Sequence, residues 1–158
     1  MHVYLMVEDA IVAAQIEQCA EAGADVITLH AECASAATGA LDMIKQRGLR
    51  AGLVLKVETP VATLKLYLGQ ISFLTLPGTS IGLKGKGLHE NALDRLKEAH
   101  AMVAAASVGH RIVVVAYGGT RHETVPKLRA AGAESVVLGS VAFSDVDLDA
   151  RMAWLAAQ

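Results

Sequence analysis

Two short glycine-containing segments have the residue types that could hold a phosphate group. Gly118-Gly119 and Gly139-Ser140 each follow a short apolar run. Residues without a bulky side chain let backbone N–H groups approach an anion closely, and the dipole of a helix that begins behind them favours negative charge. The simpler alternative is that both segments are tight turns between a strand and a helix.

A second set of residues could handle protons or a carbonyl group. His30 and Glu32 follow the apolar run Val26–Leu29, and a buried His–Glu pair could act as an acid/base couple. Tyr117 could donate a hydrogen bond to an oxyanion, although a phenol is a poor base at neutral pH. Lys56 could form a Schiff base with a ketose in an apolar site, as in aldolases. The simpler alternative is a lysine that packs its stem and extends its ammonium group into water.

These residues lie at the ends of segments that alternate between two patterns. Short β-branched runs predict strands, and the Ala- and Leu-rich stretches between them, with apolar residues three and four apart, predict helices. Such alternation is typical of βαβ units in a parallel sheet. The predicted strands are Val3–Val7, Val26–Leu29, Gly52–Leu55, Ile71–Leu76, Ile112–Ala116 and Ser135–Leu138. The predicted helices are Ala10–Glu21, Ser35–Gln46, Val61–Tyr67, Glu90–Ala106, Glu123–Ala131 and Asp147–Ala157.

Glycines mark the ends of several of these helices. Gly23, Gly48 and Gly132 each come shortly before the next strand. The turn at Ala22–Asp25 recurs as Ala131–Glu134, which is the helix-to-strand turn that barrels repeat, or a chance similarity between two such turns.

The longest predicted connection runs from Pro77 to His89. Its glycines include Gly78 and Gly82, and it also contains Lys84 and Lys86. Long loops inside a compact domain are often functional, and in a parallel α/β fold this one leaves the carboxyl end of a strand, where ligands bind. We expect Gly78 and Gly82 to line a substrate pocket, while the lysines either add positive charge near a phosphate or are solvated.

Six groups of residues, in order along the chain, resemble the ribulose-phosphate 3-epimerase family from its third strand to its eighth. They are Leu5–Asp9, Ala22–Glu32, Ala51–Leu55 with Thr59-Pro60, Pro77-Gly78, Gly118-Gly119 and Leu138–Ser140. The resemblance implies a parallel (β/α)-barrel of the ribulose-phosphate-binding TIM type, with six of its eight βα units present. It also implies an epimerase-like isomerase that acts on a pentulose (ketose) phosphate by 1,1-proton transfer through an enediolate.

The resemblance also assigns residues. Gly118, Gly119, Gly139 and Ser140 match the phosphate-binding positions of the family, and barrels commonly hold phosphate after their seventh and eighth strands. Met6 matches a place where the family lines its substrate pocket with methionines, although a methionine on a strand is usually core packing.

The catalytic positions depart from the family, which uses two aspartates and a divalent metal such as zinc or iron. Tyr117 stands where the second aspartate is found, and Tyr4 stands where a histidine ligand is found. The other positions belong to two βα units that would precede Met1, so we predict no cofactor from the matched residues. The replacements argue against ordinary epimerase activity in the isolated chain. The alternatives are a non-catalytic sugar-phosphate-binding remnant and, less favoured, a Schiff-base aldolase that uses Lys56.

Composition sets the remaining expectations. Of the 158 residues, 53% are apolar and 19% charged, with a mean hydropathy of +0.41 and a net charge of −2. The small net charge excludes an obvious nucleic-acid partner, and no apolar run is long enough to span a membrane. Cys19 and Cys33 have no metal-site spacing, which predicts free thiols in a cytoplasmic protein. We expect one domain over residues 1–158, and a homo-oligomer, because a barrel without two strands exposes two edges.

Overall fold

A single parallel sheet forms the centre of the molecule. The structure is a computed structural model that describes residues 1–80, 82, 87–143 and 147–158. Its six strands follow one another in chain order, so each strand pairs with its sequence neighbour. They are β1 (His2–Leu5), β2 (Val26–His30), β3 (Arg50–Val54), β4 (Phe73–Pro77), β5 (Val113–Tyr117) and β6 (Ser135–Val136). All six predicted strands are confirmed, and the parallel pairing of each neighbouring pair confirms the predicted βαβ units.

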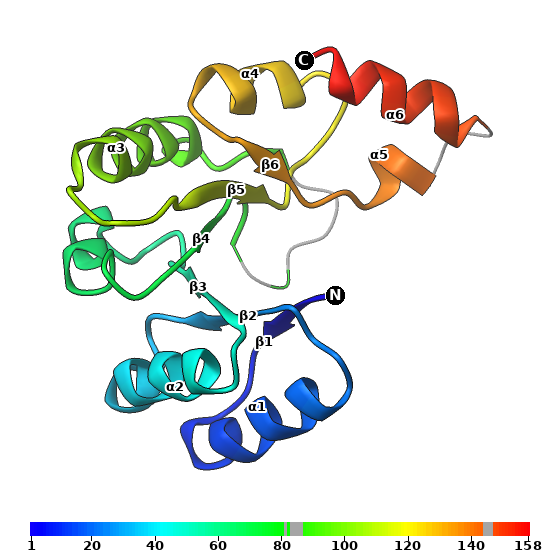
Figure 1. The fold of residues 1–158 in the computed structure, drawn as a ribbon. Helices are drawn as coiled ribbons and strands as arrows, with labels where there is room; N and C mark the ends of the chain where they lie inside the picture. The colour runs from blue at the N-terminus through cyan, green and yellow to red at the C-terminus, as the bar shows by residue number, and fades with distance from the viewer. Residues whose placement is uncertain (81, 83–86, 144–146) are drawn as a thin grey trace.

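Helices follow the strands and lie along the outer side of the curled sheet (Figure 1). The α-helices are α1 (Val12–Glu21), α2 (Ala34–Gln46), α3 (Ala92–Ala105), α4 (Val125–Ala130), α5 (Ser140–Phe143) and α6 (Leu148–Ala156). Two 3-10 helices, η1 (Asp9–Ile11) and η2 (Val61–Leu66), complete the described elements. Strands in sequential order with helices on one side are the arrangement of a (β/α)-barrel, rather than of a sheet with helices on both faces.

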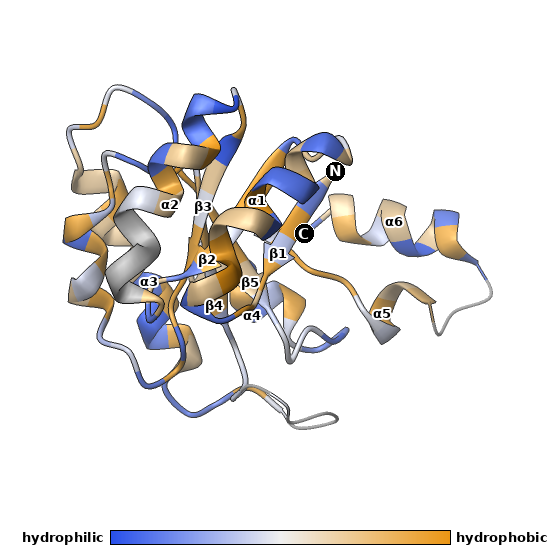
Figure 2. Ribbon diagram, turned by 90° about the horizontal axis from the view of Figure 1, so that it is seen from below, coloured by the Kyte–Doolittle hydropathy of each residue, from blue (hydrophilic) through white to orange (hydrophobic). Residues whose placement is uncertain are grey.

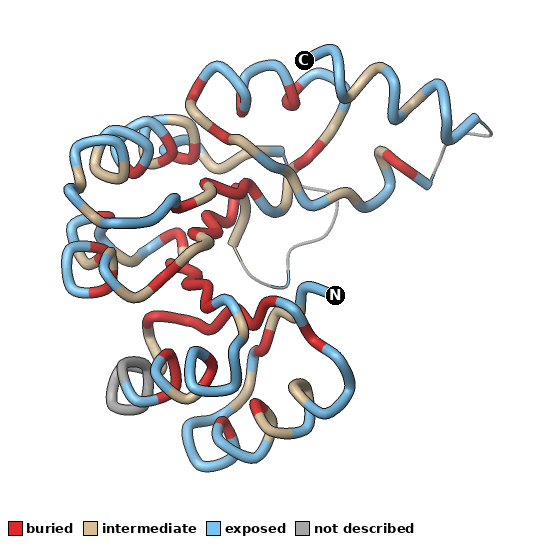
Figure 3. Tube along the Cα trace, in the orientation of Figure 1, coloured by how far each residue is buried: buried red, intermediate tan, exposed pale blue. Residues whose placement is uncertain are grey.

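The sheet has two different faces, as the alternation of side chains along a strand requires. Ile27, Leu29, Leu53, Leu74 and Val114 face the helices and are fully buried in one hydrophobic core. Figure 3 shows that burial is concentrated along the strands and on the inward side of the helices. Figure 2 shows the same division by hydropathy, with hydrophobic strands at the centre. The core therefore lies between the sheet and its outer helices.

The concave face of the sheet is more polar. Thr28, His30 and Thr75 are buried there, while Tyr4 is half-buried and Tyr117 is exposed. Polar side chains on a buried face need hydrogen-bond partners, so this face is where the sequence departs from simple core packing.

Three details differ from the sequence-based expectations. The segment Val61–Leu66 is a 3-10 helix rather than an α-helix, and the predicted helix at Ala10–Glu21 begins with a 3-10 turn. β6 has only two residues, although the Val137 N–H still donates to the Ala116 carbonyl. β6 pairs with β5 alone in the described sheet, and a strand with one partner forms fewer ladder hydrogen bonds.

The predicted helix ends are confirmed by backbone geometry. Gly23, Gly48 and Gly132 all have positive φ angles, the conformation that commonly ends a helix. Beyond β6, α6 is held to the rest of the molecule by Trp154, whose ring stacks on that of His122 with a centroid separation of 4.0 Å. No helix among the described residues is long and apolar enough to cross a membrane.

Candidate functional site

The predicted site residues lie at one edge of the sheet, because the carboxyl ends of parallel strands meet there. His30 ends β2, Tyr117 ends β5, and Gly78 directly follows β4. Met6 and Lys56 follow the ends of β1 and β3. We call this edge of the curled sheet its mouth. The fold brings to the mouth residues that are separated by more than a hundred positions in the chain.

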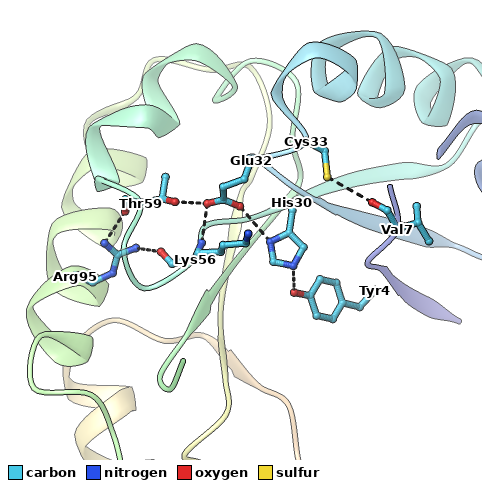
Figure 4. Close-up of polar contacts among 8 residues, drawn as sticks. All are labelled: Tyr4, Val7, His30, Glu32, Cys33, Lys56, Thr59 and Arg95. Atoms are coloured by element: carbon cyan, nitrogen blue, oxygen red, sulfur yellow. Dashed lines mark hydrogen bonds and ion pairs between the residues drawn. The ribbon is translucent and has the colours of Figure 1, made fainter. Parts of the chain in front are cut away.

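Glu32 is the centre of a hydrogen-bond network at this mouth (Figure 4). One carboxylate oxygen accepts the Lys56 backbone N–H at 2.9 Å and also the Thr59 hydroxyl. The other oxygen faces His30 Nδ1 at 3.1 Å. Burial alone would raise the pKa of Glu32, but the hydrogen bonds from Thr59, Lys56 and His30 hold this pKa below its ordinary value. Glu32 is therefore a carboxylate at neutral pH, and the predicted contact with His30 is present.

Arg95 of α3 supports the same turn from the other side. Its guanidinium donates to the Thr59 carbonyl at 2.6 Å and to the Lys56 carbonyl at 2.7 Å. Two donors in the fixed geometry of one guanidinium hold the two carbonyls at a set distance. The turn that positions Glu32 is thus braced by a helix of the outer layer. No sequence signal identified Arg95.

Tyr4 reaches the network from β1. Its hydroxyl contacts His30 Nε2 in a short hydrogen bond (Figure 4). Its ring also lies edge-on to that of Tyr117, with centroids 5.8 Å apart. Burial, then the neighbouring Tyr117, Glu32 and Cys33, raise the pKa of Tyr4, so its phenol stays protonated.

His2, two residues before Tyr4, takes no part in this contact. It begins β1 and so lies further from the mouth than Tyr4, as its strand position predicts. Its Nε2 is 2.6 Å from the Thr28 hydroxyl.

A cavity of about 440 Å³ opens beside these residues. It is lined by Met6, Val7, His30, Glu32, Cys33, Lys56, Glu58 and Ser80. Met6 is 59% exposed and lines this cavity, so it is not part of the buried core. Cys33 and Cys19 are free and half-buried, as predicted. Ligand pockets of small molecules commonly have volumes of a few hundred cubic ångströms, which matches this cavity.

The first glycine pair forms the opposite side of the mouth. Gly118 and Gly119 have φ angles of 80° and 68°, a conformation that other residues rarely adopt. The Gly78 N–H donates to the Tyr117 carbonyl at 2.7 Å, and a side chain at Gly78 would meet the Gly118 carbonyl at 2.7 Å. These two strand ends therefore approach each other closely because both carry glycine.

The second glycine segment lies one strand further. Gly139 and Ser140 are exposed, and apart from the chain neighbours no atom of the described residues lies within 4 Å of the place where a Cβ would stand on Gly139. Ser140 begins α5, which has only four residues, so the helix dipole that we expected behind this segment is small. The open space in front of Gly139 lies after β6, the neighbour of the strand that ends in Tyr117.

Thr120, next to the first glycine pair, was not identified from the sequence. Its hydroxyl is buried, and no hydrogen-bond partner for it lies among the residues that the structure describes. The expected pocket residue Gly82 is exposed with a φ of 83°, and Lys84 and Lys86 lie outside the described residues.

The described residues do not fit the divalent metal that the family resemblance implies. No group of three or more His, Cys, Asp or Glu side chains among them could hold a metal ion. The strand position of a histidine ligand carries Tyr4, a protonated phenol that already contacts His30. Protein-bound divalent metals need several deprotonated or neutral lone-pair donors around one point, and a protonated phenol is not such a donor.

The comparison with protein families agrees with the resemblance that the sequence motifs indicate. A family model described as the ribulose-phosphate 3 epimerase family matches residues 1–143. Ribulose-phosphate 3-epimerase 2 of Cupriavidus necator is 31% identical over 149 residues, which are 93% of this chain and 61% of the relative. The ribulose-phosphate 3-epimerase of Bacillus subtilis is 30% identical over 93% of this chain and 66% of its own length. The chain thus spans about three-fifths to two-thirds of these two relatives.

Solved structures support the fold. A 3-hexulose-6-phosphate synthase superposes with a TM-score of 0.68 at 20% identity, over 92% of this chain and 67% of the other. The KGPDC enzyme from Streptococcus mutans superposes with a TM-score of 0.72 at 16% identity, over 92% of this chain and 66% of the other. Both are TIM-barrel enzymes, so the predicted barrel class of the fold is confirmed.

Proposed function

Because the chain belongs to the ribulose-phosphate 3-epimerase family, we propose that it acts on a pentulose (ketose) phosphate as an epimerase-like isomerase. The observation that supports this most directly is the pair of glycine segments that follow the neighbouring strands β5 and β6. They lie at the same mouth as His30 and Glu32. One end of the mouth suits a phosphate and the other suits a sugar.

The phosphate end rests on backbone geometry. Gly118 and Gly119 adopt positive φ angles, and neither carries a side chain that would keep an anion away from its backbone. Gly139 and Ser140 face open space from the next strand. Several N–H groups on two adjacent strand ends can surround phosphate oxygens, and sugar phosphates are bound at this place in many barrels. Thr120 adds a buried hydroxyl next to these groups.

The sugar end rests on the cavity and its polar lining. Removing a proton next to a ketone produces an enediolate, which needs an acid/base group and a donor for its oxygens. The His30–Glu32 pair lines the cavity and can exchange protons. Tyr117, at the matched position of the family aspartate and 39% exposed, can donate a hydrogen bond to an enediolate oxygen.

A second candidate function is sugar-phosphate binding without catalysis. It is favoured by one observation, the tyrosine at position 117, because a phenol does not replace a carboxylate base. This candidate uses the same phosphate-binding glycines and differs from the first only in whether a proton leaves the sugar.

Solvent exchange separates the two functions. The protein is mixed with D-ribulose 5-phosphate in D₂O; NMR follows deuterium at C3, and calorimetry measures binding of the same compound. Binding with deuterium incorporation supports the isomerase. Binding without incorporation supports the non-catalytic function, and the absence of binding contradicts both.

A further inference from the structure

Tyr4, His30 and Glu32 form a continuous hydrogen-bonded row (Figure 4). The Tyr4 hydroxyl contacts one ring nitrogen of His30, and Glu32 faces the other. Glu32 is in turn held by the Lys56 N–H and the Thr59 hydroxyl. Three titratable groups are thereby joined across β1 and β2, and Tyr4, at the end of the row, has no role in the proposed function.

The direction of each hydrogen bond follows from the charge of Glu32. An ionised carboxylate only accepts hydrogen bonds, so His30 Nδ1 must carry a proton. In the neutral imidazole, Nε2 then has a lone pair, and the Tyr4 hydroxyl donates to it. If His30 gains a second proton, Nε2 becomes the donor and the Tyr4 oxygen accepts. The same contact therefore fits both protonation states of His30.

The hydrogen-bonded row is partly shielded from water by the residues around it. His30 is only 3% exposed although it lines the cavity, and Tyr4 is half-buried on the concave face. The titratable groups that act on Tyr4 besides His30 are Tyr117, Glu32 and Cys33, none of which is positively charged. The pKa of Tyr4 is raised, first by burial, so a free phenolate is disfavoured and proton exchange must involve His30.

We propose that Tyr4, His30 and Glu32 form a proton relay in which the Tyr4 hydroxyl exchanges a proton with the bound sugar phosphate. The Tyr4 oxygen takes the proton from the carbon next to the ketone while its own proton moves to His30 Nε2, so the imidazole supplies the basicity that a phenol alone lacks. The C–H electron pair stays on the substrate as the enediolate, and the imidazolium is paired with Glu32. The reverse transfers return a proton to the same face of the enediolate, so the relay accounts for solvent exchange at this carbon, and epimerisation needs a second proton donor on the opposite face. This proposal rests on the proposed isomerase function, and Glu32 acts in it as a positioning residue.

The test uses Tyr4→Phe, which keeps the ring and removes the hydroxyl. Tyr67→Phe is the matched control, because Tyr67 is buried in the outer core, away from the mouth. We expect Tyr4→Phe to lower the rate of deuterium incorporation into D-ribulose 5-phosphate by about 10²- to 10⁴-fold, the usual contribution of an acid/base group. The dissociation constant should change less than about threefold, since the phosphate contacts remain. Tyr67→Phe should leave the rate within about twofold.

Imidazole ¹⁵N NMR of the unmodified protein and of Tyr4→Phe supplies a measurement that does not depend on activity. His30 should be the Nδ1–H tautomer, and its Nε2 signal should move toward that of an unbonded nitrogen in Tyr4→Phe. An Nε2–H tautomer, or an unchanged signal, would overturn the relay. An unchanged exchange rate in Tyr4→Phe would overturn the relay alone, whereas binding without exchange in the unmodified protein would overturn the isomerase function together with it.

Discussion

Replacing Glu32 with glutamine should destabilise the protein at neutral pH and much less in acid. The carboxylate accepts hydrogen bonds from Lys56 N–H, from Thr59 and from His30. Glutamine keeps one oxygen but turns its amide group toward His30 Nδ1, which is itself a donor. Weakening two charged hydrogen bonds by about 1 kcal/mol each and breaking a third of about the same strength would total roughly 3 kcal/mol. Because the side chain is 23% exposed, water compensates part of this loss, and we expect about 2 kcal/mol.

The pH dependence follows from the direction of the pKa shift of Glu32. Hydrogen bonds hold this pKa in the folded state below the ordinary value of 4.5 despite the opposing effect of burial. The stability that the carboxylate contributes is therefore fully present above the unfolded pKa and is lost as the pH falls through the folded pKa. The difference between the two proteins should shrink accordingly below about pH 4.5.

Urea unfolding of both proteins at about pH 7 and about pH 3.5 measures this difference. The matched control is Glu58→Gln, an exposed carboxylate that lines the same cavity, which we expect to change the free energy of unfolding by less than about 0.5 kcal/mol. A loss below about 0.5 kcal/mol for Glu32→Gln at neutral pH, or one that is the same at both pH values, would show that the charge of Glu32 does not stabilise this turn.

Two further predictions concern a turn and a lysine. Gly132→Ala should destabilise the protein more than Gly23→Ala. The positive φ costs each about 1 kcal/mol, but the new Cβ at position 132 would lie 2.5 Å from the His100 ring, while at Gly23 no described residue other than the chain neighbours lies within 4 Å. Equal losses in urea unfolding would contradict the packing at His100. Borohydride treatment with D-ribulose 5-phosphate should add no mass to Lys56, because enediolate chemistry needs no Schiff base. An adduct on Lys56 in the peptide mass spectrum would favour the aldolase alternative.

The fold could be predicted because the pattern of each segment agreed with its neighbours. Runs such as Val113–Tyr117 are apolar and β-branched, and a glycine ends several of the helices between strands. Less was predictable for η2, where a short apolar segment fits an α-helix and a 3-10 helix equally well. β6 is shorter than its sequence indicates, and its single partner in the described sheet does not explain this, because β1 also pairs with one strand and has four residues.

The site was only partly predictable for a physical reason. His30 and Glu32 are two residues apart, and side chains at this spacing along a strand point the same way, so their contact could be expected. Tyr4 and Arg95 reach the same network from β1 and α3, at separations of 26 and 36 or more residues. A single sequence carries no signal for such contacts, since they depend on strand register and helix packing. Tyr4 was identified only as a departure from the family, not as a partner of His30.

The glycine segments should be the place where the sugar phosphate binds, and calorimetry of D-ribulose 5-phosphate with Gly139→Asp measures this. A new Cβ at Gly139 would have no described residue within 4 Å besides its chain neighbours, so the fold should persist. A carboxylate about 5 Å from a phosphate of nearly two negative charges costs about 1.5 kcal/mol even in water, and several times more at lower dielectric. We predict at least a tenfold loss of affinity, with no loss in the matched variant Gly109→Asp, whose new Cβ would likewise have only chain neighbours within 4 Å among the described residues. An affinity of Gly139→Asp equal to that of the unmodified protein would show that the phosphate does not bind at the glycine segments.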